Sequence, residues 1–162
     1  MDPNTLDPQR DIRGVLITVT GGRLLLPNAS VAEVITYSEP EPVANAPDWL
    51  LGRVRWRGWR LPLLSFPRLA GWSSEDGHLG AKVAVLKALG GNAKLPFFAV
   101  LSQGFPRLVT VSRTALVESH DIKELPLGVH SRVTLNDDPA AVPDLLSVEL
   151  LIQKALDHAQ AA

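Results

Sequence analysis

Short apolar runs separated by paired glycines constrain the fold of this chain more than any other feature. The first such unit consists of the apolar run 14–20, the pair Gly21-Gly22 and a second apolar run at 23–27. Glycines are favoured between two strands because hairpin turns need positive backbone φ angles that other residues adopt at a cost. We therefore predict a β-hairpin, with strands at 14–20 and 23–27.

The same pattern occurs again later in the chain. Residues 21–27 and 90–96 share the form G-G-x-x-x-L-P, and the second copy lies between apolar runs at 82–89 and 95–101. Two similar β-subdomains, divided near the polar segment 71–80, would produce this repeat. Chance recurrence of a common hairpin signal would produce it equally well. We expect 71–80 to be a surface loop.

A third hairpin is predicted over 49–64, with strands near 53–57 and 59–65 and a turn at Gly58. Val54 and Trp56 alternate with arginines, so one face of the first strand is apolar and the other is cationic. We expect Val54 and Trp56 to be buried.

Helical signals are few. Asn28 is placed to cap a short helix, because Val31, Val34 and Ile35 follow at i, i+3 and i+4 spacing. Three prolines make 38–48 a stiff extended connection. A closing helix is expected over about 147–160. With a further strand at 108–111, the chain is predicted to be mainly β.

Composition excludes several classes of function. The 162 residues carry 16 basic and 17 acidic side chains, a balance that argues against a nucleic-acid coat or a membrane-surface binder. The chain has no cysteine, so thiolate metal sites and cysteine nucleophiles are excluded. We find no catalytic motif and no histidine pair at metal-ligand spacing. The expectation is a cytoplasmic protein with a flexible lead-in at 1–12, without enzymatic activity, cofactor, metal or membrane insertion.

One segment, 49–72, contains an unusual mixture of arginine and tryptophan. These two residue types are enriched at protein–protein hot spots, and the same mixture binds single-stranded nucleic acid on small barrels. We expect the tryptophans, Trp56 and Trp59 in particular, to fill a core and the arginines to serve recognition. The residues concerned are Arg53, Arg55, Arg57, Arg60 and Arg68, with Trp49, Trp56, Trp59 and Trp72.

This segment resembles the core of the CheW-like domain family. Residues 52–62 match the family pattern G-x-x-x-x-R-G-x-x-x-P, and 26–35 are similar to its A-L-P-x-x-x-V-x-E-V segment. The resemblance covers about 13–156 and is more specific in the first half. It implies two packed, SH3-like, five-stranded β-barrels with a short helix and a C-terminal helix. The implied subdomains span about 13–70 and 80–145.

The resemblance implies an adaptor that carries no active site. Such proteins bind the cytoplasmic tip of a methyl-accepting chemoreceptor and the regulatory domain of a CheA-type histidine kinase. The positions that match family contact residues are Val31, Glu33, Val34, Arg57 and Gly58; Arg53, Arg55 and Arg60 are further candidates from the cationic face. For Arg57 two interpretations stay open: partner contact, or a bond to backbone or Glu33 that shapes the turn.

The chain departs from the family pattern at several positions. Arg55 replaces the usual asparagine, and Ser65-Phe66-Pro67 stands where an aspartate-leucine-arginine run is usual. These departures favour a divergent member, similar to the ChpC-like adaptors of chemosensory systems that control type IV pili and twitching motility. The alternative function is a nucleic-acid-binding β-barrel that uses 49–72.

Overall fold

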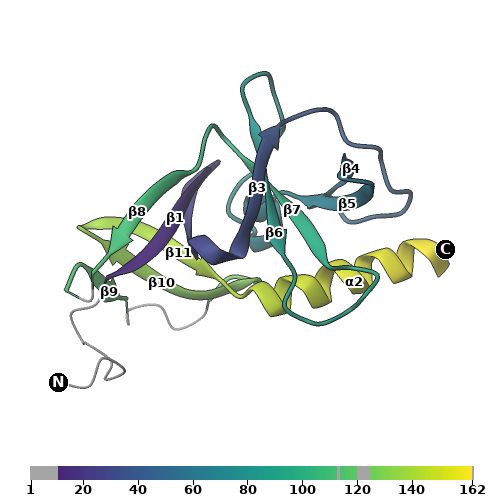
Figure 1. Cartoon of the computed structure of the whole chain (residues 1–162). Coiled ribbons are helices and arrows are strands. Elements are labelled where there is room, and N and C mark those ends of the chain that lie inside the picture. The colour runs from purple at the N-terminus through teal and green to yellow at the C-terminus, as the bar shows by residue number, and fades with distance from the viewer. Residues whose placement is uncertain (1–10, 113, 120–124, 162) are drawn as a thin grey trace.

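The computed structural model describes residues 11–112, 114–119 and 125–161. Within these ranges the chain forms eleven strands in two sheets, two α-helices and one short 3-10 turn, η1 (Asn28–Ser30) (Figure 1). The prediction of a mainly β chain is confirmed. Most of the lead-in predicted at 1–12 lies outside the described residues, and its last residue, Ile12, already begins the first strand.

The first sheet has six strands in the order β8-β1-β2-β11-β10-β9. Its neighbours pair antiparallel except β2 and β11, which meet in parallel at Leu24 and Ala141. The hairpin predicted around Gly21-Gly22 is present, with Val19 opposite Gly22. The strands are β1 (Ile12–Val19), β2 (Gly22–Pro27), β8 (Arg107–Val111), β9 (Leu116–Glu118), β10 (Val129–Leu135) and β11 (Asp138–Pro143).

The second sheet has five strands in the order β3-β6-β7-β5-β4. Two predicted hairpins lie in it: β4–β5, which turns at Gly58, and β6–β7, whose connection carries Gly90-Gly91. The connection that follows β3 runs beside the outer strand β4, with a bridge between Glu41 and Arg53. The strands are β3 (Val31–Thr36), β4 (Leu50–Trp56), β5 (Trp59–Leu64), β6 (Lys82–Lys87) and β7 (Phe97–Ser102).

The sheets do not divide the chain at 71–80. Strands β8 to β11 return to the sheet that contains β1 and β2, so each sheet draws on both of the segments predicted as subdomains, 13–70 and 80–145. The physical reason is the parallel contact between β2 and β11, which adds the last hairpin beside the first one. The two glycine-pair hairpins nevertheless fall in different sheets, one in each.

The short helix predicted after Asn28 is wrong. Residues 28–30 form a single 3-10 turn, and Val31 to Thr36 then form strand β3. A β-bulge between Val31 and Glu33 adds one residue to this strand. The bulge shifts the alternation of side chains, so apolar residues fall at 31, 34 and 35 and imitate helical spacing.

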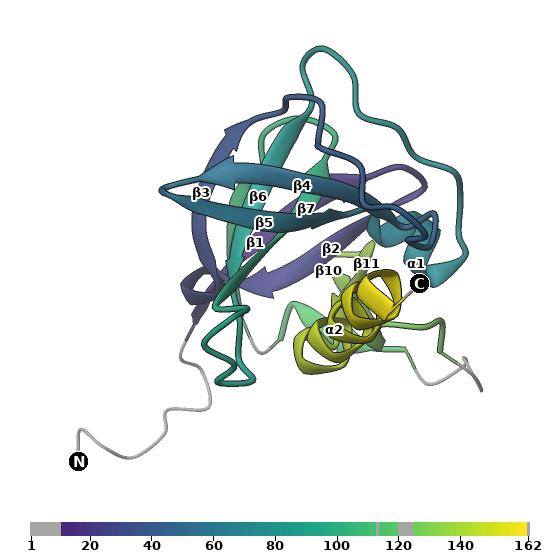
Figure 2. The same ribbon diagram turned by 90° about the vertical axis from the view of Figure 1, so that its right-hand side faces the viewer.

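The apolar core is built in three layers. A central cluster joins the two sheets and is covered by α1 (Phe66–Ala70) and by α2 (Leu145–Ala161), which inserts Val148 and Ile152. Each sheet also has a cluster of its own on the far side, around Trp56 in the second and Leu135 in the first. The predicted closing helix is α2, which Figure 2 shows nearly end-on beside β10 and β11.

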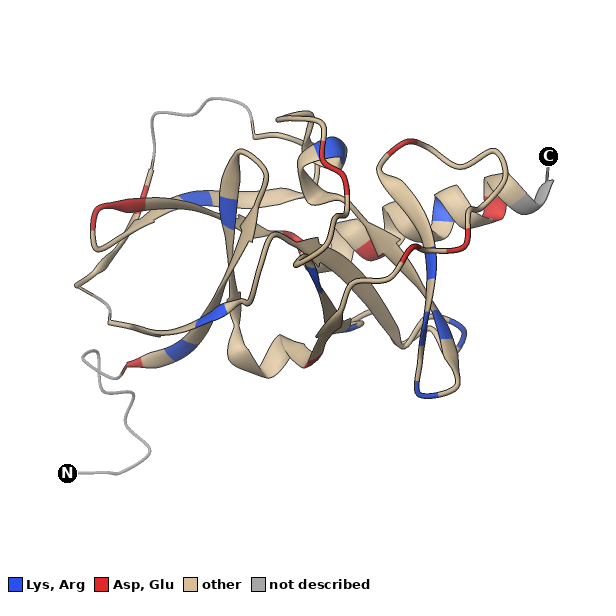
Figure 3. Ribbon diagram, turned by 90° about the horizontal axis from the view of Figure 1, so that it is seen from above, with Lys and Arg blue, Asp and Glu red and all other residues tan. Residues whose placement is uncertain are grey.

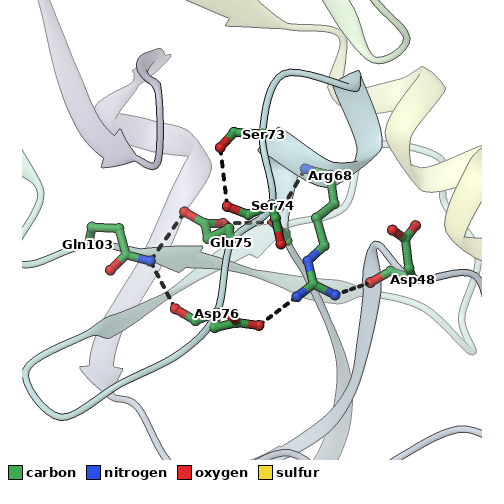
Figure 4. Close-up of polar contacts among 8 residues, drawn as sticks. Asp48, Arg68, Ser73, Ser74, Glu75, Asp76 and Gln103 are labelled. Carbon is green, nitrogen blue, oxygen red and sulfur yellow. Dashed lines mark hydrogen bonds and ion pairs between the residues drawn. The ribbon is translucent and has the colours of Figure 1, made fainter.

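Two buried carboxylates connect loops to this framework. Glu75 is only 2% exposed and accepts hydrogen bonds from the Thr20 amide (2.8 Å) and the Ser65 hydroxyl (2.8 Å). It also accepts from the Gln103 side chain at 3.2 Å, as Figure 4 shows. Glu149 of α2 accepts from the amides of Leu89 (2.6 Å) and Gly90 (2.9 Å). The segment 71–80 is therefore fastened at Glu75 to both sheets, whereas we expected only a surface loop.

Candidate functional site

The candidate site is centred on the turn between β4 and β5. Trp56 and Trp59 face each other across the hairpin, and Arg57 and Gly58 form the two-residue turn. Both turn residues have positive φ, +46° and +82°, as a type I′ turn requires. Glycine adopts this conformation freely, whereas a long side chain such as Arg57 adopts it at a cost.

Arg57 forms an exposed ion pair with Glu33. Its guanidinium donates to the Glu33 carboxylate at 2.6 Å and also lies over the Trp56 ring, 5.1 Å from its centroid. The two side chains are 69% and 35% exposed. Because Glu33 lies on β3 and Arg57 follows β4, the pair links the two outer strands of the five-stranded sheet. Glu33 thus lies on a strand and not on the predicted helix.

The other predicted contact residues have mixed environments. Val31 is half-buried and packs against the central core, and Val34 is half-buried opposite Ala84 of β6. Gly58 is exposed, and a side chain added there would meet open space, so only its positive φ requires glycine. The structure brings Glu33, Arg57 and Gly58 together. Val31 and Val34 lie along β3, and both side chains are half-buried.

A cationic depression adjoins this ion pair. Arg55 and Arg60 are directly opposite each other on β4 and β5, and both form ion pairs with Glu41, the Arg55 contact at 3.8 Å. Figure 3 shows the basic positions gathered on this hairpin. The depression has a volume of about 520 Å³ and is lined by Glu41, Arg55, Trp56, Arg57, Gly58, Trp59 and Arg60. Arg53 stands beside it on β4, half-exposed.

Sequence reasoning missed the role of Glu41. The proline-bearing connection 38–48 indicated only an extended linker, yet the Glu41 backbone pairs with Arg53 at 2.8 and 2.9 Å. Gly52 permits this approach, because a side chain at that position would collide with the Glu41 carbonyl. The available signal was an acidic residue in a stiff segment next to a cationic hairpin.

The tryptophans of 49–72 divide between core and surface. Trp56 is 8% exposed and packs edge-to-face on Phe97 at 4.8 Å, which confirms the burial predicted for it and for Val54. Trp49 and Trp72 pack against the central core as half-buried residues. Trp59 is 41% exposed, so its predicted place in the core is wrong. It lies at the end of the hairpin, beyond the apolar cluster that Trp56 completes.

This arrangement does not favour the nucleic-acid alternative. Arg55, Arg57 and Arg60 each lie against a carboxylate, and Arg68 pairs with Asp76 at 2.6 Å. Three of the four tryptophans are buried or half-buried and leave little aromatic surface on which bases could stack.

No metal or membrane feature is found in the part of the chain that the structure describes. Its His, Asp and Glu side chains form no group of three that could hold a metal ion. Its helices include none that is long and apolar enough to cross a bilayer.

Comparison with models of protein families shows which family the chain belongs to. The family model of the CheW-like domain matches residues 13–155. The chain belongs to the CheW-like domain family. CheW-like domains are non-catalytic scaffolds of chemosensory systems, so the chain is an adaptor and not an enzyme.

A solved structure supports the same fold. The scaffolding protein TtCheW from Thermoanaerobacter tengcongensis matches with a TM-score of 0.70 at 12% sequence identity, over 90% of this chain and 91% of that one. No curated protein sequence matches significantly. The fold is therefore retained at a sequence identity too low to carry over individual residue roles.

Proposed function

We propose that this CheW-like domain couples the cytoplasmic tips of methyl-accepting chemoreceptors to the regulatory domain of a CheA-type histidine kinase in the cytoplasm. The observation that carries the proposal is the exposed Glu33–Arg57 ion pair. The resemblance of 26–35 and 52–62 to the family's sequence pattern supports partner contact at these two residues. Val31, Val34 and Gly58 complete the proposed contact, with Arg53, Arg55 and Arg60 as neighbouring cations.

Two physical arguments support a binding role for this pair. An exposed ion pair contributes only about 0–1 kcal/mol to stability, so closing the sheet does not require it. Arg57 also occupies a positive-φ turn position at which asparagine or glycine would be less strained. Backbone strain at an exposed turn residue is typical of functional sites.

The test separates partner contact from turn geometry. We expect Glu33→Ala and Arg57→Ala each to weaken binding to purified kinase regulatory domain or receptor tip by about 1–3 kcal/mol, roughly 5- to 150-fold. Calorimetric titration measures the affinity and thermal unfolding the stability. Lys154→Ala, an exposed cation on α2, serves as the control and should bind normally.

A charge-swapped variant, Glu33→Arg with Arg57→Glu, sharpens the test because it keeps an ion pair between the two strands. We expect its melting temperature to stay near normal while its binding is lost. Restored binding in the swapped variant would show that the pair acts only through the shape of the turn.

The proposal also specifies which kind of motility the chemosensory system controls. The departures at Arg55 and 65–67 support a divergent adaptor of the ChpC-like kind, in a system that controls pilus-based twitching motility. Deletion of the chain from its host should then reduce twitching on surfaces and leave swimming unchanged. The opposite pattern would assign it to flagellar control.

A further inference from the structure

Arg55 and Arg60 form a like-charge pair that the hairpin does not need for its fold. They are directly opposite each other on β4 and β5. Like charges in this position destabilise a sheet, whereas opposite charges or apolar pairs stabilise it. Both guanidiniums extend into solvent, with the Arg55 side chain 85% exposed, so neither contributes to the core. Both side chains are therefore free to make contacts outside the core.

Glu41 shows what the pair binds. Its carboxylate contacts one terminal nitrogen of Arg55 and one of Arg60, and so lies between the two guanidiniums. Each guanidinium has five N–H donors in a planar fork that fits carboxylate oxygens. Most of these donors therefore remain directed to solvent. The site already holds one carboxylate of this chain and has donors left for another.

We infer that the Arg55–Arg60 pair, with the exposed ring of Trp59, forms a second contact surface that binds an acidic segment of a partner protein. Glu41 competes for this surface from within the chain. The depression of about 520 Å³ that these residues line is large enough for several side chains. With three arginines and one glutamate, its lining carries a net charge of about +2.

Charge complementarity favours a protein segment over a nucleic acid. Glu33 and Glu41 flank the hairpin and would repel a continuous phosphate backbone, whereas separate carboxylate side chains can be placed between them. The whole chain, with a net charge of −1, offers no extended attraction to a polyanion. The inference rests on the proposed function and deepens it, because it assigns carboxylate binding to Arg55 and Arg60, the cations beside the proposed receptor and kinase contact. Loss of peptide binding in the arginine variant with normal kinase or receptor binding would separate the two.

The experiment uses the full chain and a fluorescein-labelled polyglutamate decapeptide, with binding measured by fluorescence anisotropy at low salt. We expect Arg55→Gln with Arg60→Gln to weaken binding about tenfold, as the loss of two exposed charge contacts implies. The matched control, Arg107→Gln with Lys154→Gln, removes the same total charge from exposed positions elsewhere and should change binding less than about twofold.

Glu41→Gln should change the peptide affinity in the opposite direction from the arginine variant. Removing the internal competitor should strengthen peptide binding about threefold, because both guanidiniums are released. The inference is overturned if Glu41→Gln weakens binding, or if the control loses as much as the arginine variant. It is also overturned if a thymidine oligonucleotide binds more tightly than the peptide and is lost with the same arginines. Melting temperatures identify any variant whose fold has changed.

Discussion

Replacement of Glu75 tests how the loop 71–80 is held. The Glu75 carboxylate accepts from the Thr20 amide and the Ser65 hydroxyl, each at 2.8 Å, and from Gln103 at 3.2 Å. Thr20 belongs to the first hairpin and Gln103 follows β7, so one carboxylate links the loop to both sheets. Ser65 is fully buried and also caps α1.

Glu75→Ala leaves two buried or half-buried donors without an acceptor, Thr20 N–H and Ser65 O–H. Each stranded donor costs about 1–3 kcal/mol, so we expect a loss of about 4 kcal/mol in the free energy of unfolding. Glu75→Gln should cost only about 1 kcal/mol, because the amide oxygen still accepts from Thr20 while the Ser65 hydroxyl turns to accept from the amide nitrogen.

Urea unfolding measures both variants, with the midpoint compared at an unchanged slope. Asp76→Ala is the matched control: its carboxylate is 84% exposed and pairs with Arg68, and it should cost less than about 1 kcal/mol. If Glu75→Ala unfolds at the same urea midpoint as Asp76→Ala, water replaces the hydrogen bonds of Glu75 without cost. The inference that Glu75 stabilises the fold is then wrong.

Two further predictions concern stability. Trp56→Ala should lower the free energy of unfolding by about 3–5 kcal/mol, as expected for a buried aromatic, while Trp59→Ala should cost less than about 1 kcal/mol; equal melting temperatures would contradict this contrast. The His78 pKa is raised, because its ring nitrogens lie 2.8 Å from the Leu79 carbonyl and 2.5 Å from Gln103 Oε1. The protonated ring therefore stabilises the fold fully below about pH 6.5 and the effect is lost as the pH rises through the folded pKa. An NMR titration midpoint for His78 at or below about 6.5 would refute it.

Sequence patterns predicted the local hairpins well because their signals are local. Period-two alternation in 53–57 and the glycine at position 58 determine a strand and its turn within a few residues. The α2 helix was visible for the same reason, in the spacing of Val148 and Ile152. Strand β10 has a local signal too, because buried residues alternate with exposed or half-buried ones over Val129–Leu135.

Features that depend on distant contacts were not predictable in this way. The bulge in β3 imitated a helix, since one extra residue changes the apparent period of the apolar residues. The pairing of β2 with β11 joins segments more than a hundred residues apart, and no local pattern indicates it. Glu75 and Glu41 occur in polar loops, where exposure is the ordinary expectation, and only the folded structure supplies their partners.

The β4–β5 hairpin has an inner face that packs in the core and an outer face whose ion pairs can be exchanged. Trp56 is fastened in the apolar cluster by its contact with Phe97, so the position of the turn depends on the core. Arg55, Arg57 and Arg60 are held on the outside by exposed ion pairs that are each worth about 1 kcal/mol or less. A partner carboxylate can replace Glu41 at this cost without disturbing the core. Because the exchange is nearly balanced in energy, contacts made here form and dissociate readily, as transient signalling interfaces require.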